Sequence, residues 1–119
     1  MADNWYQGNA TDENDQHRGW LLGHFINGED ATIRKTNALE VKWGIHKAGE
    51  QRPEWTTDED RTTLFMLING NWRLDLTVGT FTLNRPGDYI VWGPGIDHSW
   101  QAQADSTVLT IRWPSLRVE

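Results

Sequence analysis

The chain has 119 residues, of which 37% are hydrophobic and eight are tryptophan. This length is close to that of one ordinary domain and leaves too little sequence for a second hydrophobic core, so we expect a single domain. The formal net charge of -6, from 11 basic and 17 acidic side chains, disfavours a nucleic-acid partner, because that binding depends on basic groups that neutralise phosphates. The lack of cysteine in the sequence excludes disulfides, thiolate metal ligands and a cysteine nucleophile.

The first 16 residues are rich in Asp, Asn, Glu and Gln, with Trp5 and Tyr6 as the aromatic exceptions. Such a composition buries too little surface to order itself, so we predict a flexible arm over residues 1–16 and a folded domain over residues 17–119. The arm lacks the basic start and apolar stretch of a secretory signal, and the chain has no run of about 18 apolar residues. We therefore expect a cytoplasmic protein with no membrane partner.

From Gly19 onward, short apolar runs rich in β-branched and aromatic residues are separated by Gly, Pro, Asn and Asp, which is typical of strands. No window has the 3.6-residue period of an amphipathic helix. The absence of a helix to cover a flat sheet favours a closed barrel or a two-sheet sandwich. We predict nine strands, over residues 20–26, 32–35, 39–46, 62–69, 72–76, 80–83, 89–92, 98–102 and 107–113.

Two of these segments, 39–46 and 107–113, show a clear alternation of apolar residues with polar or small ones. If the apolar residues face the core, Trp43 and Ile45 point inward and His46 points outward, which makes His46 a surface or interface residue. The dipeptide Asn69-Gly70 lies between two apolar runs and is a strong signal for a hairpin.

The stretch RPGDYIVWGPGIDHSW, residues 85–100, combines two turns with a short buried strand. The first turn is predicted at NRPG, residues 84–87, and GPG at residues 93–95 forces a second turn just before His98. Glycine permits a positive φ in such turns, and Pro94 stiffens the corner. The segment therefore delivers one imidazole at the start of a strand.

The spacing of Gly87, Gly95 and His98 resembles the second conserved motif of the cupin family, G-x5-P-x-G-x2-H-x3-N. Gly93 stands where the motif has proline, with a proline one place later, and Ala102 stands where the motif has asparagine. The resemblance implies an all-β fold, the jelly-roll barrel that is also called a double-stranded β-helix, in a single small domain.

The first cupin motif, G-x5-H-x-H-x3,4-E-x6-G, aligns by its last glycine on Gly70. Its glutamate then falls on Thr63, and its two histidines fall near Thr56 and Asp58. The resemblance implies a divalent metal held by histidines and a glutamate of both motifs, and only His98 is kept from that set. We therefore predict no metal at the usual cupin position and no cofactor. A metal-dependent enzyme with a reduced ligand set around His98, such as a dioxygenase, isomerase or lyase, stays open as the alternative.

Indole rings and the charged loop at residues 49–61 supply further candidate contacts. Trp100 shares a strand face with His98 because the two are two residues apart. A barrel mouth lined by indoles and a few polar groups suits a small, partly apolar or sugar-like ligand, and an arginine of the loop would pair with an anionic group of that ligand. Plain core packing for each tryptophan and a solvated loop are the alternatives. The candidate ligand-binding residues are His98, Trp100, Trp43, Arg52, Glu54, Trp55 and Asp58.

The sequence thus predicts a protein that binds a small molecule. It assigns no catalytic residue, and it leaves open whether the protein is an enzyme, because one fold supports many activities. The resemblance to small cupins also predicts a homodimer, formed through the outer sheet and edge strands. The aromatic residues of the arm would add a contact with the second subunit.

Overall fold

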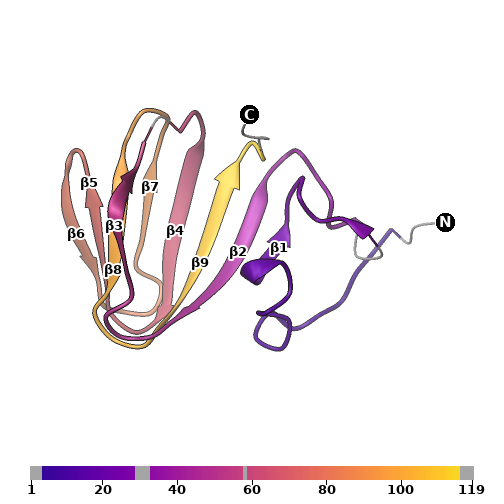
Figure 1. The fold of residues 1–119 in the computed structure, drawn as a ribbon, viewed down its shortest axis with the longest axis horizontal. Helices are drawn as coiled ribbons and strands as arrows, with labels where there is room; N and C mark the ends of the chain where they lie inside the picture. The colour runs from indigo at the N-terminus through magenta and orange to yellow at the C-terminus, as the bar shows by residue number, and fades with distance from the viewer. Residues whose placement is uncertain (1–3, 29–32, 58, 116–119) are drawn as a thin grey trace.

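The computed structural model describes residues 4–28, 33–57 and 59–115. Strands dominate this part of the chain, and a short 3-10 helix precedes them (Figure 1). No helix among the described residues has the length and apolar character needed to cross a membrane. The elements in chain order are η1 (His17–Gly19), β1 (Trp20–Leu22), β2 (Glu40–His46), β3 (Gln51–Thr56), β4 (Thr62–Asn69), β5 (Trp72–Leu76), β6 (Gly79–Leu83), β7 (Tyr89–Trp92), β8 (His98–Ala102) and β9 (Ser106–Trp113).

The strands form two antiparallel sheets that face each other around a common interior (Figure 1). The five-stranded sheet has the order β1-β2-β9-β4-β7, and the four-stranded sheet has the order β3-β8-β5-β6. Strands that are neighbours in a sheet are mostly distant in the sequence, as β2 and β9 are, which is the arrangement of a jelly roll. This architecture confirms the predicted all-β fold.

The core lies between the sheets. Burial alternates along β4 and β5, so that every second side chain of each strand faces the interior. Trp72 is its largest fully buried side chain, and its ring stacks on that of Trp100, with centroids 4.7 Å apart and planes 23° apart. The core consists of Phe65, Leu67, Trp72, Leu74, Leu76, Leu83, Trp92, Ala102 and Val108.

Seven of the predicted strands agree with observed strands to within one residue at each end. The strand predicted over residues 20–26 ends at Leu22. Residues 33–35 contribute only an isolated bridge between Gly23 and Lys35, and Thr32 lies outside the described residues. β3 was not predicted, because it lies at the edge of its sheet and is exposed along most of its length, so its sequence lacks an apolar alternation.

The hairpin signal at Asn69-Gly70 is wrong, because β4 and β5 belong to different sheets. Gly70 has a φ of 112°, and a Cβ at this position would lie 2.2 Å from Oγ of Ser106. Glycine at this position therefore lets the chain pass close to Ser106 where it crosses from one sheet to the other. The two-residue hairpin of this region joins β5 to β6, where Leu76 pairs with Gly79.

The predicted orientation of β2 is also wrong. The period of two is present, but Lys42 lines the interior and His46 packs its ring against Trp72 and Trp100, with centroid distances of 5.0 and 4.9 Å. Ile45, one residue from His46, is exposed. The apolar side chains of β2 therefore lie on the outer face of the five-stranded sheet, and its polar side chains face inward.

Part of the N-terminal segment contacts the barrel. The Asn14 side-chain amide donates to the carbonyl oxygen of Trp43 at 2.7 Å, and the guanidinium of Arg34 lies 4.5 Å from the ring centroid of Tyr6. Trp5 is exposed. The division into a flexible arm and a barrel stays a prediction.

Candidate functional site

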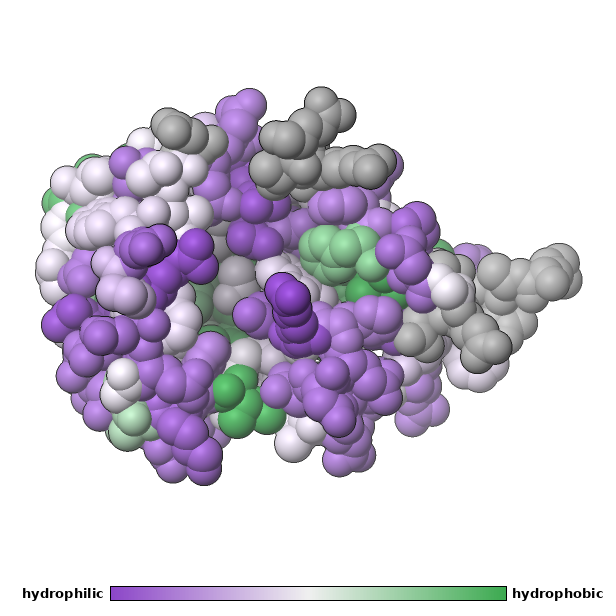
Figure 2. Space-filling view, viewed as in Figure 1, coloured by the Kyte–Doolittle hydropathy of each residue, from purple (hydrophilic) through white to green (hydrophobic). Residues whose placement is uncertain are grey.

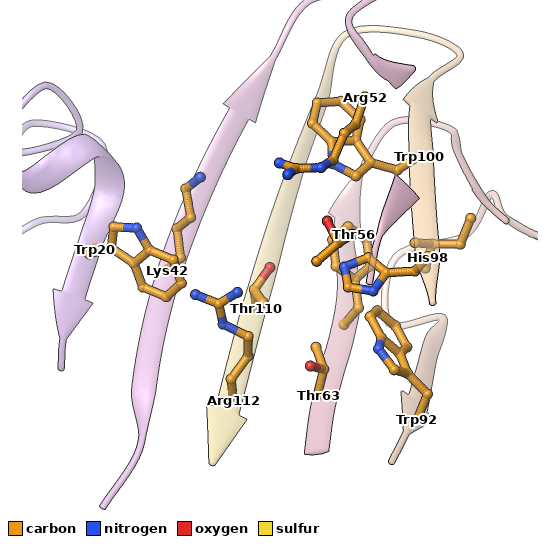
Figure 3. Close-up of a pocket in the computed structure, with 12 residues that line it drawn as sticks. Trp20, Lys42, Arg52, Thr56, Thr63, Trp92, His98, Trp100, Thr110 and Arg112 are labelled. Atoms are coloured by element: carbon orange, nitrogen blue, oxygen red, sulfur yellow. The ribbon is translucent and has the colours of Figure 1, made fainter. Parts of the chain in front are cut away.

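A cavity of about 290 Å³ opens between the two sheets. In the space-filling view its mouth is a hollow surrounded largely by hydrophilic side chains (Figure 2), and Figure 3 shows how the lining side chains converge on it from both sheets. A space of this size suits a small organic molecule. Its lining residues are Trp20, Lys42, Arg52, Thr56, Thr63, Phe65, Leu74, Trp92, His98, Trp100, Thr110 and Arg112.

The turn before β8 delivers His98 to this cavity, as the sequence predicts. Gly95 has a φ of 84°, and its N–H donates to the carbonyl oxygen of Glu59 at 3.0 Å. His98 pairs with Thr56 across β3 and β8, and its ring centroid lies 5.0 Å from that of Trp92. The turn therefore fixes both the backbone and the ring of His98.

The imidazole of His98 lies close to the carboxylate of Glu59, which flanks the cavity. Nε2 of His98 lies 3.7 Å from Oε1 of Glu59. Burial lowers the pKa of His98 below its ordinary value of 6.5; the Glu59 carboxylate opposes this shift, and the guanidinium groups of Arg52 and Arg112 add to it. The ring is therefore neutral at pH 7.

A buried carboxylate lies behind the cavity wall. Glu40 is 0% exposed and accepts hydrogen bonds from Arg61 at 2.8 Å, from Ser115 at 2.8 Å and from Arg112 at 2.5 Å. A buried charge is tolerated only when it is paired and hydrogen-bonded, and Glu40 meets both conditions. Because Arg112 also lines the cavity, this ion pair holds one wall of the site in place.

Glu59 extends the same network. Its Oε2 accepts from Nη2 of Arg61 at 2.6 Å and from Nε at 2.9 Å, and it lies 3.7 Å from Nη1 of Arg112. The loop that carries Glu59 and Arg61 is thereby tied to Glu40 on β2 and to Arg112 on β9. The two carboxylates and the two guanidinium groups balance in charge.

Lys42 is a further cation of the cavity, and it lies near the same indole ring as Arg112. Nζ of Lys42 lies 5.5 Å from the ring centroid of Trp20, and the guanidinium carbon of Arg112 lies 4.6 Å from the same centroid. Burial lowers the pKa of Lys42, and Arg112, Arg18 and Arg52 lower it further. Repulsion among like charges is therefore a property of this site.

Three of the residues predicted to bind a ligand meet in the cavity, namely Arg52, His98 and Trp100. Trp43, Glu54 and Trp55 do not line it. Trp43 pairs with Leu109 on the outer face of the sheet, because the inward positions of β2 are the polar ones.

Glu54 and Trp55 are exposed on β3, where Trp55 keeps 45% of its surface in solvent. Asp58 lies outside the described residues.

Sequence reasoning missed Lys42, Arg112 and Trp20. Lys42 occupies an inward position of β2, and Arg112 occupies one of β9 directly opposite Glu40. An inward assignment of the polar side chains in 39–46 and 107–113 would have found the two cations. Trp20 lies on β1 and joins the site only because β1 pairs with β2, and no local signal indicates that pairing.

The described residues do not fit the divalent metal that the cupin resemblance implies. Thr56 and Thr63, which stand near the motif positions of a histidine and the glutamate, line the cavity with hydroxyl groups, which are poor ligands for the metals that imidazole and carboxylate bind. Glu59 directs Oε2 to Arg61. No group of three His, Cys, Asp or Glu side chains that could hold a metal occurs within residues 4–28, 33–57 and 59–115.

The substitution Glu40→Gln should destabilise the fold by about 3 to 5 kcal/mol, because it removes the buried charge that pairs with two partly buried guanidinium groups. Urea unfolding followed by tryptophan fluorescence measures this loss. Glu54→Gln is the matched control, because Glu54 is exposed, and it should change the free energy of unfolding by less than about 0.5 kcal/mol. Equal effects of the two substitutions would contradict the role of the network.

The lowered pKa of His98 predicts a dependence of stability on pH. Above the unfolded-state pKa of about 6.5, the contribution of this ring to the free energy of unfolding has its full value. As pH falls from there toward the folded-state pKa, this contribution decreases, because the unfolded chain binds a proton that the folded protein does not. His98→Gln should remove this part of the acid destabilisation in urea unfolding. A pKa of His98 at or above its ordinary value, measured by NMR titration of the ring, would contradict it.

No family model matches this sequence, and no curated protein matches it. Similar folds do occur among solved structures. KdgF from Halomonas sp. is 21% identical with a TM-score of 0.60, and the match covers 66% of this chain and 72% of that one. A cupin-2 domain containing protein from Shewanella frigidimarina is 19% identical with a TM-score of 0.53, over 66% of this chain and 74% of that one.

A cupin protein from Bacteroides fragilis is 19% identical with a TM-score of 0.57, over 69% of this chain and 70% of that one. Identities of this size show a likeness of fold and carry no statement of activity. The match agrees with the two antiparallel sheets and with the resemblance of the segment around His98 to the second cupin motif. This chain has the fold of a small cupin.

Proposed function

We propose that this protein binds a small organic molecule in the cavity between its sheets, without a metal at the usual cupin position. The observation that carries the proposal is the chemistry of the lining, which combines indole faces with hydroxyl groups and one neutral imidazole. Ligand pockets of proteins have this composition, in which apolar walls hold a ligand and a few polar groups orient it.

The aromatic part of the lining suits a ring. Trp100 is held against Trp72 and His46, so its orientation is fixed before a ligand arrives. Trp92 lies against the ring of His98. A planar or sugar ring stacked on a fixed indole loses little additional side-chain entropy on binding, which favours affinity.

The polar part of the lining suits a ligand with hydroxyl or carbonyl groups. Oγ1 of Thr63 is buried without a hydrogen-bond partner among the described residues. An unpaired buried hydroxyl is costly, and a ligand atom or a water within the cavity would satisfy it. Thr56 and Thr110 add two more hydroxyl groups.

We also propose that the protein is a homodimer that pairs through the outer face of the five-stranded sheet. Two apolar rows cross four strands of this face. Val91 of one row is 46% exposed and Tyr89 of the other is 60% exposed, which leaves a large apolar surface on a single copy. The rows are Val41, Ile111, Leu64 and Val91, and Trp43, Leu109, Met66 and Tyr89.

The first test combines elemental analysis with ligand binding. Protein purified without chelator should carry no stoichiometric metal. Saturation-transfer NMR with a panel of small sugars and aromatic compounds should detect ligands that bind the intact protein and bind His98→Ala at least about tenfold more weakly. Trp55→Ala is the control, because Trp55 is exposed and does not line the cavity. One iron, nickel or zinc per chain, lost in His98→Ala, would contradict the proposal and support the metal-dependent enzyme.

The second test addresses the homodimer. Light scattering should give about twice the chain mass of 13.7 kDa for the protein, because apolar surface of this extent is stable only when covered. Val91→Glu should give a monomer, since it places a charge in the proposed interface. Val78→Glu is the matched control, because Val78 is 69% exposed and does not belong to either row. A monomeric wild-type protein would overturn the proposal.

A further inference from the structure

Among the described residues, the charges around the cavity do not cancel. Glu40 and Glu59 pair with Arg61 and Arg112, so two negative groups meet two positive ones. The remaining two cations of the lining, Lys42 and Arg52, have no ion pair with any carboxylate in residues 4–28, 33–57 and 59–115. His98 adds no charge at neutral pH, because burial lowers its pKa.

We propose that Lys42 and Arg52 together form an oxyanion-binding site, so that the ligand of this cavity is a small organic acid. This inference rests on the proposed binding function and names the class of molecule that is bound. The ligand would place its carboxylate or phosphate between the two cations and its ring or carbon chain against the indoles.

The placement of the two cations supports a clamp. Lys42 comes from β2 of the five-stranded sheet, and Arg52 comes from β3 of the four-stranded sheet, so they reach the cavity from opposite sides. In Figure 3 the guanidinium of Arg52 points from its strand toward the side that carries Lys42. An oxyanion between them would accept charge-assisted hydrogen bonds from both, and these are about twice as strong as neutral ones.

The electrostatic state of the site also favours an anion. Arg112 and Arg52 act on Lys42 from within the same cavity, and their repulsion adds to the effect of burial on its pKa. A bound anion relieves this repulsion, while a cationic ligand or a divalent metal increases it. The whole chain has a formal charge of -6, so the positive potential is local to the cavity and does not attract anions to the surface at large.

The surroundings define the rest of the ligand. Arg52 is the cross-strand neighbour of Trp100, so an anion at Arg52 lies beside the indole that would hold a ring. The cavity of about 290 Å³ has room for on the order of ten water molecules, which is close to the size of a sugar acid or an aromatic acid. The two cations would recognise a carboxylate and a phosphate by the same chemistry. The experiment therefore includes both kinds of anion and compares them.

The experiment compares anions with neutral molecules of the same shape. The probes are D-glucuronate and D-glucose 6-phosphate against D-glucose, and benzoate against benzamide, each titrated into the full-length protein at constant ionic strength. Tryptophan fluorescence and NMR of the indole N–H groups report binding. At least one anion should bind at least about tenfold more tightly than its neutral counterpart, and the carboxylate and phosphate arms show which oxyanion is preferred.

The variant for this site is Lys42→Met combined with Arg52→Gln. It should lower the affinity for the preferred anion by about tenfold or more, and this loss should exceed the loss for the neutral counterpart. The control is Lys47→Met combined with Arg85→Gln, which removes the same two charges from exposed positions outside the cavity. Arg52→Gln alone serves if the double variant fails to fold, because Arg52 is exposed and its loss leaves the core intact.

The outcomes separate this inference from the proposed function. Equal binding of anions and neutral counterparts, or an unchanged anion affinity in the double variant, would overturn the inference and leave the binding function standing. Binding of none of the five probes up to about 10 mM would overturn the inference, while the broader panel of sugars and aromatic compounds would still test the proposed function. A tenfold preference that the control keeps and the double variant loses would support the inference.

Discussion

The carboxylate of Glu40 is the group on which the site depends. It is fully buried and binds two guanidinium groups, of Arg61 and Arg112, together with the hydroxyl of Ser115. Arg61 in turn binds Glu59, whose carbonyl oxygen accepts from the turn that presents the candidate imidazole, His98. One buried charge thus connects β2, β9 and the end of the described chain to the loop beside the cavity. A charge in this position is stable only when its partners are in place, so the fold and the site form together.

The barrel departs from the simple rule that apolar side chains face inward. In β2 and β9 the inward side chains include Lys42 and Arg112, while Val41 and Ile111 pair on the outer face. The interior is therefore divided into an aromatic part around Trp72 and a polar part that forms the cavity. A second copy of the chain that covers the outer apolar face would explain its exposure, and a small molecule in the cavity would explain the polar interior.

Two proposals for the cavity, that it holds no metal at the usual cupin position and that it binds an oxyanion, follow from the same charges. Hydroxyl groups of Thr56 and Thr63 occupy positions near His98 where the cupin resemblance places metal ligands, and Lys42 and Arg52 add positive charge to the same space. Such a lining disfavours a divalent cation and favours an oxyanion. The fold then supplies a shaped cavity between rigid sheets, and the side chains that line it select what is bound.

Local sequence determined seven of the nine strands and the turns before β7 and β8, because the period of two and the need for glycine at Gly87 and Gly95, with φ of 94° and 84°, are properties of short segments. The same patterns correctly placed His98 and Trp100 on one face of β8. Only the tertiary structure decided which face of β2 lies inside and which strands meet at the cavity. A period of two shows which side chains share a face but not where that face points, and Arg52 reaches the site through β3, an edge strand whose exposure hides it from any hydrophobic pattern.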